Sequence, residues 1–183
     1  MLSKNLEKIE QLIQKTYFTT LDIVNLFNIN HNYAKLLCSR YVKRGIFIRL
    51  KSGLYTTRVR WNFNTQKDFL SIASMLQVPS YVSLMTALAY YEITTQILQN
   101  FYESVCTKRS INIRIENTEF RYYKINKAFF GGFKKIDDYF VAEPEKAFID
   151  AIYLYSFGKY SIDISSLNFK KLNYLKIKDI ISK

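Results

Sequence analysis

The stretch from Asn30 to Thr57, NHNYAKLLCSRYVKRGIFIRLKSGLYTT, changes its hydrophobic period at Gly45. Before this glycine, apolar residues recur at the spacing of one face of a helix: Ala34, Leu37, Cys38, Tyr41 and Val42. Asparagine is a good N-terminal cap, and glycine readily takes the left-handed conformation in which many helices end. The stretch therefore predicts a helix over residues 31–44 that is capped by Asn30 and ends at Gly45.

The residues after Gly45 predict a β-hairpin, because apolar and basic side chains alternate there with the two-residue period of a strand. The pattern places Ile46, Ile48 and Leu50 on one face and Phe47, Arg49 and Lys51 on the other. Gly53 favours a tight turn, after which residues 54–57 form the returning strand.

Two further helices are predicted upstream of this stretch, over residues 3–15 and 20–27. The second begins after Thr19, with Asp22 at the spacing of a capping box. Three helices followed by a hairpin are the order of a winged helix-turn-helix, in which the third helix enters the major groove of DNA. The sequence therefore predicts that residues 1–60 form a winged helix-turn-helix DNA-binding domain.

The formal net charge of the 183-residue chain is +12, from 27 Lys and Arg against 15 Asp and Glu. A basic balance of this kind favours polyanionic partners such as nucleic acid. The excess is concentrated, because residues 1–60 hold 11 Lys and Arg against only 3 Asp and Glu. We therefore expect double-stranded DNA to be a partner of the first domain.

The polar face of the predicted third helix carries most of the candidate DNA-binding residues. Near its start, four side chains are placed to reach base edges: His31, Asn32, Lys35 and Ser39. Farther along, three basic side chains are better placed for phosphates: Arg40, Lys43 and Arg44. The hairpin adds three residues that are expected to touch the backbone or the adjacent minor groove: Arg49, Lys51 and Ser52. Two alternatives stay open, since exposed Lys and Arg are ordinary on a solvated surface and winged helices also bind proteins.

Residues 65–183 predict a second, small α+β domain, joined to the first through residues 58–64, so the fold class is α+β. Helices are expected over residues 65–77, 83–91, 144–157 and 170–182. Between residues 102 and 142, short runs with a period of two predict a mostly antiparallel sheet. The stretch FRYYKINKAFFGGF at 120–133 is interpreted as a half-buried sheet, with a stacking platform for single strands as the alternative.

No catalytic residue, metal site or cofactor is predicted. The single histidine lies on the candidate DNA-binding helix, which leaves no Ser–His or Cys–His pairing, and the two cysteines lack the spacing of a zinc site. The motif EPEK at 143–146 fits the E-x-K spacing of a metal-dependent nuclease poorly. We expect Glu145, Lys146 and Asp150 at the surface, as a first-turn acid and an i,i+4 pair. A nucleic-acid enzyme in residues 65–183 is kept as an alternative.

The N-terminal segment MLSKNLEKIE mixes both signs of charge and lacks the apolar run of a secretory signal. No stretch approaches the run of about 18 apolar residues that a spanning helix needs. The chain is therefore predicted to be cytoplasmic, with no membrane partner.

Five segments occur in a familiar order: GIFIRLKSGLY at 45–55, PSYVSLMTALAYYEI at 79–93, VCTKR at 105–109, FRYYKI and GGF within 120–133, and VAEPEKAFIDAIYLY at 141–155. This order resembles the AbiEi-type antitoxins, which are transcriptional regulators of abortive-infection (type IV) toxin–antitoxin systems. The resemblance covers roughly residues 5–158.

The resemblance implies that the chain is the antitoxin of a phage-defence pair. Its winged helix would bind inverted repeats in the pair's own promoter and act as an autorepressor. Its C-terminal domain would counter a nucleotidyltransferase-like toxin without forming a stable complex with it. The alternative is a stand-alone winged-helix transcriptional regulator, or a protein-interaction module, without antitoxin activity.

Overall fold

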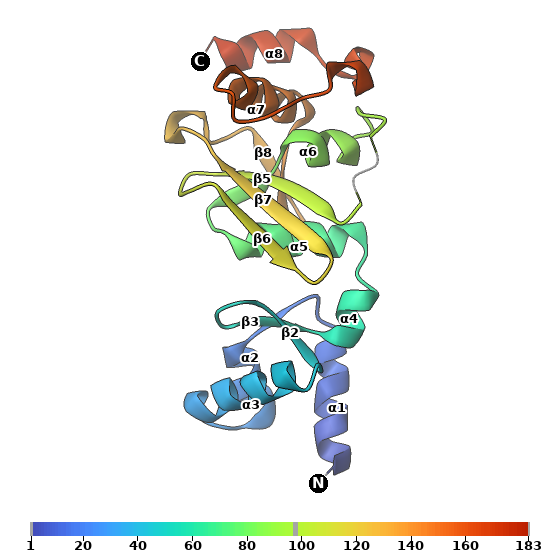
Figure 1. Ribbon diagram of the computed structural model, residues 1–183, viewed down its shortest axis with the longest axis vertical. Helices are drawn as coiled ribbons and strands as arrows, with labels where there is room; N and C mark the ends of the chain where they lie inside the picture. Colours follow the sequence, from blue (N-terminus) through green and yellow to red (C-terminus); the bar gives the residue numbers. More distant parts are fainter. Residues whose placement is uncertain (1, 97–98, 183) are drawn as a thin grey trace. The chain divides into compact units, whose positions relative to one another are not determined.

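The computed structural model describes residues 2–96 and 99–182, with side chains from Glu7 onward. It confirms the α+β class, with two separate sheets among its helices (Figure 1). Contacts divide the chain into two compact units, Met1–Ile72 and Ala73–Lys183. The division lies inside helix α5 (Gln66–Leu76), whereas the sequence places the junction at residues 58–64.

The first unit consists of helices followed by a hairpin. Its elements are α1 (Leu2–Ile13), β1 (Phe18–Thr19), α2 (Thr20–Phe27), α3 (His31–Lys43), β2 (Phe47–Lys51), β3 (Leu54–Thr57), α4 (Arg58–Asn62) and the start of α5. The strands form an antiparallel sheet in the order β1-β3-β2. The predicted second and third helices and both hairpin strands are present within one residue of their predicted bounds.

Local capping interactions explain these boundaries. The Thr19 hydroxyl accepts a hydrogen bond from the Asp22 N–H, and the Asp22 carboxylate accepts one from the Thr19 N–H, which completes the predicted capping box. The Asn30 carboxamide oxygen accepts from the Tyr33 N–H at 2.8 Å and starts α3. Gly45 has φ +70°, and the next N–H donates back to the Tyr41 carbonyl at 2.9 Å. These short-range contacts set the start of α2 and both ends of α3 close to the predicted bounds.

An aromatic cluster holds the helices of the first unit on the hairpin. The Phe47 ring lies edge-on to both Phe18 and Tyr41, with centroids 4.9 Å apart in each pair. The remaining buried members of this cluster are Leu12, Ile23, Ala34, Cys38 and Tyr55. Burial raises the pKa of the Cys38 thiol to about 11, so this cysteine stays protonated and serves as a small core residue, as expected.

Two elements of the first unit were not predicted. Strand β1 is only two residues long and pairs with β3 at Phe18 and Thr19. Helix α4 occupies most of the predicted junction, because the Thr57 hydroxyl caps it by accepting from the Arg60 N–H at 3.0 Å. Trp61 is buried in α4 and stacks edge-on to Phe69 in α5. The first five residues of the predicted junction at 58–64 are therefore helical.

Asp68 joins the segments at the end of the first unit. Its carboxylate accepts hydrogen bonds from the Thr16 hydroxyl at 2.7 Å, from Arg60 at 2.6 Å and from the Thr65 N–H at 2.8 Å. Burial opposes ionisation of this carboxyl, but the donors outweigh it and hold the pKa of Asp68 below its ordinary value. The side chain thus ties the chain after α1 to α4 and α5.

We expect Asp68→Asn to lower the free energy of unfolding by about 1–3 kcal/mol at pH 7, because the amide cannot satisfy all these donors. Since the folded pKa lies below the unfolded one, this contribution is complete above the ordinary carboxyl pKa of about 4 and is lost as the pH falls through the folded value. Urea unfolding at pH 7 and pH 3 measures both values. The exposed Glu10→Gln is the control, and an equal loss at both pH values would contradict the assignment.

The second unit contains a six-stranded sheet with helices packed on it. Its elements are β4 (Ser80–Val82), α6 (Leu84–Tyr90), β5 (Phe101–Cys106), β6 (Ile111–Ile115), β7 (Thr118–Lys124), β8 (Phe133–Ile136), β9 (Tyr139–Ala142), α7 (Pro144–Ser156) and α8 (Tyr174–Ile181), with short 3₁₀ turns at Lys127–Phe129, Ile164–Ser166 and Phe169–Lys171. Helices α6 and α7 pack together, α6 also contacts β5, and α8 contacts α7 (Figure 1). All four predicted helices of this region are present, counting α5.

The sheet has the order β6-β7-β5-β4-β9-β8 and is mixed. The pairings β6·β7, β4·β5 and β8·β9 are antiparallel, whereas β5·β7 and β4·β9 are parallel. The prediction of a mostly antiparallel sheet missed these two parallel pairings and missed β4, which lies at the centre of the sheet. The period of two is confirmed in β7, where Phe120 and Tyr122 are buried and form part of the core.

Glu145, Lys146 and Asp150 are not at the surface, so that part of the prediction is wrong. Lys146 is 5% exposed and Asp150 is 2% exposed, and Glu145 is also buried. The lysine ammonium donates to Asp150 Oδ1, while Asp150 Oδ2 accepts from the hydroxyls of Tyr81 at 3.0 Å and Ser83 at 2.8 Å. Because each charge finds its partner four residues away, this polar pair can lie on the inner face of α7.

Candidate nucleic-acid interface

Helix α3 has one buried and one exposed face. Ala34, Cys38 and Tyr41 are buried against the aromatic cluster of the first unit. On the opposite side, every candidate residue of the helix is exposed: His31, Asn32, Lys35, Ser39, Arg40, Lys43 and Arg44. The helical spacing therefore separates the residues that anchor α3 from those that face a partner.

The hairpin brings its basic residue to the same side as α3. Phe47 and Arg49 lie on one face of β2 by the alternation of the strand, and Phe47 is in the cluster that α3 covers. Arg49 pairs across the ladder with Tyr55 and is exposed. Ser52 is exposed in the turn, whereas Lys51 is half-buried.

The turn of the hairpin is attached to the beginning of α2. Gly53 has φ +75°, a conformation that favours glycine, and its carbonyl accepts a hydrogen bond from the Thr20 N–H at 3.0 Å. This bond uses one of the N–H groups that the first turn of a helix leaves without an internal partner. The turn of the hairpin is therefore anchored on α2.

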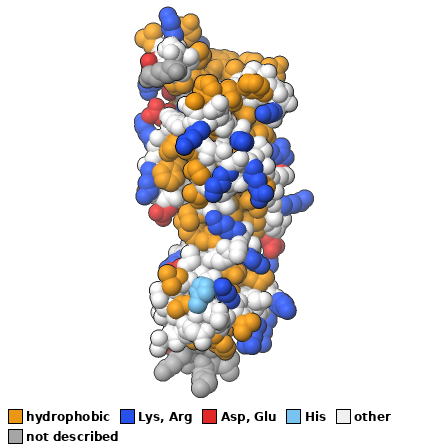
Figure 2. Space-filling model, turned by 90° about the vertical axis from the view of Figure 1, so that its left-hand side faces the viewer, with side chains coloured by type: hydrophobic (Ala, Val, Ile, Leu, Met, Phe, Trp, Pro, Cys, Tyr) orange, Lys and Arg blue, Asp and Glu red, His pale blue; other side chains and the backbone are white. Residues whose placement is uncertain are grey.

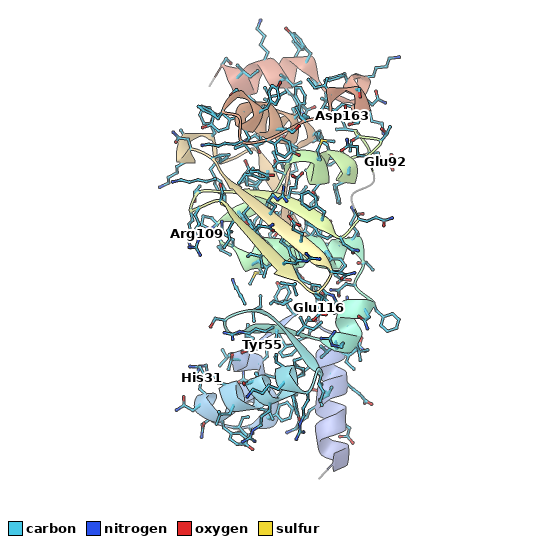
Figure 3. The ribbon with its side chains drawn as sticks, in the orientation of Figure 1. His31, Tyr55, Glu92, Arg109, Glu116 and Asp163 are labelled. Carbon is cyan, nitrogen blue, oxygen red and sulfur yellow. The ribbon has the colours of Figure 1, made fainter. Side chains whose placement is uncertain are left out.

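A hollow of about 470 Å³ opens where these three elements meet. It is lined by Thr19, Thr20, Leu21, His31, Lys35, Ser39, Arg49, Ser52, Gly53 and Tyr55. Figure 3 labels two of these residues, His31 at the beginning of α3 and Tyr55 on the hairpin. The structure thus brings together five candidates from two separate segments: His31, Lys35, Ser39, Arg49 and Ser52. The other five, Asn32, Arg40, Lys43, Arg44 and Lys51, do not line it.

The hollow has a positive character. Lys35 and Arg49 line it from two sides, and the N-terminal end of α2 adds the positive end of a helix dipole. None of its described lining residues is acidic, and the nearby Asp22 is paired with Lys15 at 2.6 Å. In the space-filling view, the histidine lies beside Lys or Arg side chains (Figure 2). An anion that carries several acceptor oxygens fits this arrangement.

Sequence reasoning missed the contribution of β1 and α2 to this hollow. Thr19, Thr20 and Leu21 reach it because β1 pairs with β3 and because the turn bonds to Thr20. The capping box at Thr19 marks the beginning of a helix, which is a common anion-binding element. It gives no indication, however, that the hairpin will lie next to it.

Comparisons with known proteins add no identification. The chain matches no protein-family model and no curated protein sequence.

In the part of the chain that the structure describes, no three His, Cys, Asp or Glu side chains are grouped so that they could hold a metal ion. None of the helices in the described ranges combines the length and apolar character that crossing a bilayer requires.

Proposed function

We propose that the first unit is a winged helix-turn-helix that binds double-stranded DNA, with α3 as the recognition helix and the β2–β3 hairpin as a short wing. The observation that carries this proposal is the hollow in which Lys35 and Ser39 of α3 meet Arg49 and Ser52 of the hairpin. A DNA backbone that follows α3 into the major groove passes such a hollow, and its phosphates are the polyanion that the basic lining suits.

The residues then divide into two roles. Asn32, Lys35 and Ser39 lie on the exposed face within the first turns of α3, where a recognition helix reaches base edges. Arg40, Lys43 and Arg44 at its end bind phosphates and orient the helix. Because the wing is short and its turn is bonded to Thr20, Arg49 and Ser52 contact only the adjacent backbone.

We further propose that the protein represses its own promoter through inverted repeats and acts as the antitoxin of an AbiEi-type, type IV pair. This part rests on the ordered motifs in residues 45–155 that resemble that family. The second unit would then counter a nucleotidyltransferase-like toxin without a stable complex, in the cytoplasm. Co-expression with the neighbouring gene tests it: rescue of growth by the full chain supports antitoxicity, and toxicity that the chain leaves unchanged refutes it.

DNA binding is tested with the DNA upstream of the protein's own gene and a scrambled DNA of the same composition, at 50 mM and 150 mM salt. We expect a complex with the upstream DNA that persists at the higher salt and a weaker, salt-labile complex with the scrambled DNA. Equal and salt-labile binding to both would refute sequence-specific recognition.

Two single variants separate base reading from phosphate binding. Lys35→Ala is expected to cost about 1–3 kcal/mol on the operator and much less on scrambled DNA, because it removes a base contact. Lys43→Ala is expected to weaken both complexes alike and to reduce the salt slope by about one unit. Fluorescence anisotropy with both DNAs measures the two effects. If both variants behave identically, the division of α3 into base and phosphate contacts is wrong.

A protein-interaction module is the second candidate, because the same surface exposes apolar side chains. Leu21 is 60% exposed and Leu36 is 55% exposed, although both lie next to candidate DNA-binding residues. In the DNA-binding proposal, Leu36 contacts a thymine methyl group. Leu36→Ala therefore distinguishes the two: a loss confined to one base position of the operator favours DNA, and unchanged DNA binding favours a protein partner.

A further inference from the structure

A second hollow, of about 630 Å³, lies in the second unit and has no part in the proposed DNA binding. Its lining includes Phe101, Glu103, Arg121, Tyr123, Tyr160 and Asp163. The lining comes from α6, the segment between α6 and β5, the strands β5 and β7, and the segment after α7. Asp163 in that segment is labelled in Figure 3.

Glu103 is the unusual member of this lining, because it is a carboxyl group that is only 2% exposed. Its Oε2 accepts a hydrogen bond from the Tyr160 hydroxyl at 2.9 Å, and the nearby Tyr123 hydroxyl and Met85 main chain also favour its ionised form. These partners are neutral, and within the described residues Glu103 forms no ion pair. Burial raises the pKa of this carboxyl to about 7, against the weaker opposing effect of these donors and of Arg121.

The two basic side chains that line the hollow among the described residues, Arg121 and Lys159, already contact groups other than Glu103. Arg121 is paired with Glu119 and lies over the Phe101 ring, 5.0 Å from its centroid. Lys159 lies over the Phe157 ring at 5.6 Å. Asp163 adds a second carboxylate, bonded to Gln96 at 3.2 Å. In a chain of net charge +12, this hollow therefore presents a buried acid without its own counter-ion.

The walls around Glu103 are aromatic. Phe101, Tyr123 and Tyr160 all line the hollow, and the rings of Tyr123 and Tyr160 meet edge to face with centroids 5.4 Å apart. Aromatic faces attract cations through the ring quadrupole, most strongly where water is excluded. Proteins hold organic ammonium groups by combining aromatic rings of this kind with a carboxylate.

We propose that this hollow binds a small organic cation, whose ammonium group becomes the counter-ion of Glu103 and whose carbon body lies against Phe101, Tyr123 and Tyr160. Pockets of this size and mixed lining are typical of small-molecule sites. The bound cation stabilises the ionised carboxylate, so binding removes the cost of burying Glu103 without a partner.

Binding must then depend on pH through Glu103. A cation binds the ionised carboxylate, so affinity rises as the pH increases through about 7. The other titratable groups that face Glu103 are Tyr123 and Arg121 from β7 and Tyr160 after α7, with Lys159 and Asp163 at the edge of the hollow. The pKa values of Tyr160 and Tyr123 are raised because they are buried, and the pKa of Asp163 is lowered by its bonds to Ser165, so these three groups keep their charge state near neutral pH.

The experiment titrates the full chain with phenethylamine and with 2-phenylethanol, which replaces the ammonium by a hydroxyl of similar size. Calorimetry and amide chemical shifts report binding at pH 6 and pH 8. We expect saturable binding of the amine, at least about tenfold tighter than the alcohol, and about tenfold tighter at pH 8 than at pH 6. Chemical shifts should change at residues that line the hollow. Equal binding of the two probes, or no saturable binding of the amine, overturns the proposal.

Three variants complete the test. Glu103→Gln is expected to lose at least about tenfold in amine affinity and all of the pH dependence, whereas the exposed Asp138→Asn should change neither. Tyr160→Phe keeps the ring and removes the hydroxyl that bonds Glu103, so it should move the midpoint of the pH profile upward. A folded Glu103→Gln that still binds the amine with the same pH profile overturns the proposal. If Glu103→Gln does not fold, the Tyr160→Phe variant decides the question. A pH profile of amine binding whose midpoint is unchanged in Tyr160→Phe then overturns the proposal.

Discussion

Replacing Lys146 by methionine is expected to lower the free energy of unfolding by about 3–5 kcal/mol. The substitution removes the cation from a buried pair and leaves Asp150 with only the hydroxyls of Tyr81 and Ser83. Burial already raises the pKa of Asp150, and Lys146 is the main influence that opposes this rise. Without the lysine, the carboxyl must lose its hydration with no charge to compensate it.

Urea unfolding of the full chain, followed by circular dichroism, measures this loss. The matched control is Lys170→Met, which removes an exposed lysine and should change stability by less than about 0.5 kcal/mol. Asp150→Asn in the Lys146→Met background keeps an acceptor for Tyr81 and Ser83 but removes the unpaired charge. The double variant should therefore be more stable than Lys146→Met alone. A loss below about 1 kcal/mol for Lys146→Met would show that the pair is not desolvated.

Reversing both charges of the first hollow, with Lys35→Glu and Arg49→Glu, is expected to weaken operator binding by about a hundredfold or more. Each residue contributes a contact of about 1–3 kcal/mol in the proposed complex, and each glutamate adds repulsion from the phosphates. The two side chains come from α3 and β2 but line one hollow, so the variant changes a single surface. The salt slope should fall by about one unit, because Arg49 is the phosphate contact of the two and Lys35 contacts a base.

The control for this prediction changes net charge by the same amount in the second unit, with Lys124→Glu and Lys127→Glu. Both side chains are exposed and belong to the aromatic, basic stretch for which single-strand stacking is the alternative. Anisotropy with operator DNA at two salt concentrations compares the two double variants. If the control loses as much affinity as Lys35→Glu with Arg49→Glu, binding depends on total charge and not on the hollow.

The sequence predicts those parts of the fold that short-range interactions determine. The capping residues Thr19 and Asn30 and the left-handed Gly45 act within a few residues of their own position, so the bounds of α2 and α3 follow from them. No such local signal marks the two-residue β1 or the three-residue β4. They are strands only because they pair with segments that are distant in the sequence. The parallel direction of β5·β7 and β4·β9 is likewise set by the packing of the whole sheet.

The distinction between short-range and long-range interactions also applies to the first hollow and to the buried pair of Lys146 and Asp150. Helical and strand periods place His31, Lys35 and Ser39 on one face of α3 and Arg49 on one face of β2. These periods do not reveal that Thr20 and Tyr55 also line the hollow. The hydrogen bond from Thr20 to Gly53 and the pairing of β3 bring these two residues there. The spacing of Lys146 and Asp150 predicts that they pair. The i,i+4 spacing does not reveal whether the pair is buried, because it is the same on an exposed and on a buried face of a helix.

The bond between the Gly53 carbonyl and the Thr20 N–H has a consequence for any ligand of the first hollow. It closes a ring of chain that runs from Thr20 through α2, α3 and β2 to Gly53, so the lining is already ordered before a partner arrives. Association then loses little conformational entropy from the protein, and no folding of the wing accompanies it. The heat-capacity change of complex formation should accordingly match the apolar area that the contact buries, without the larger negative value that coupled folding adds.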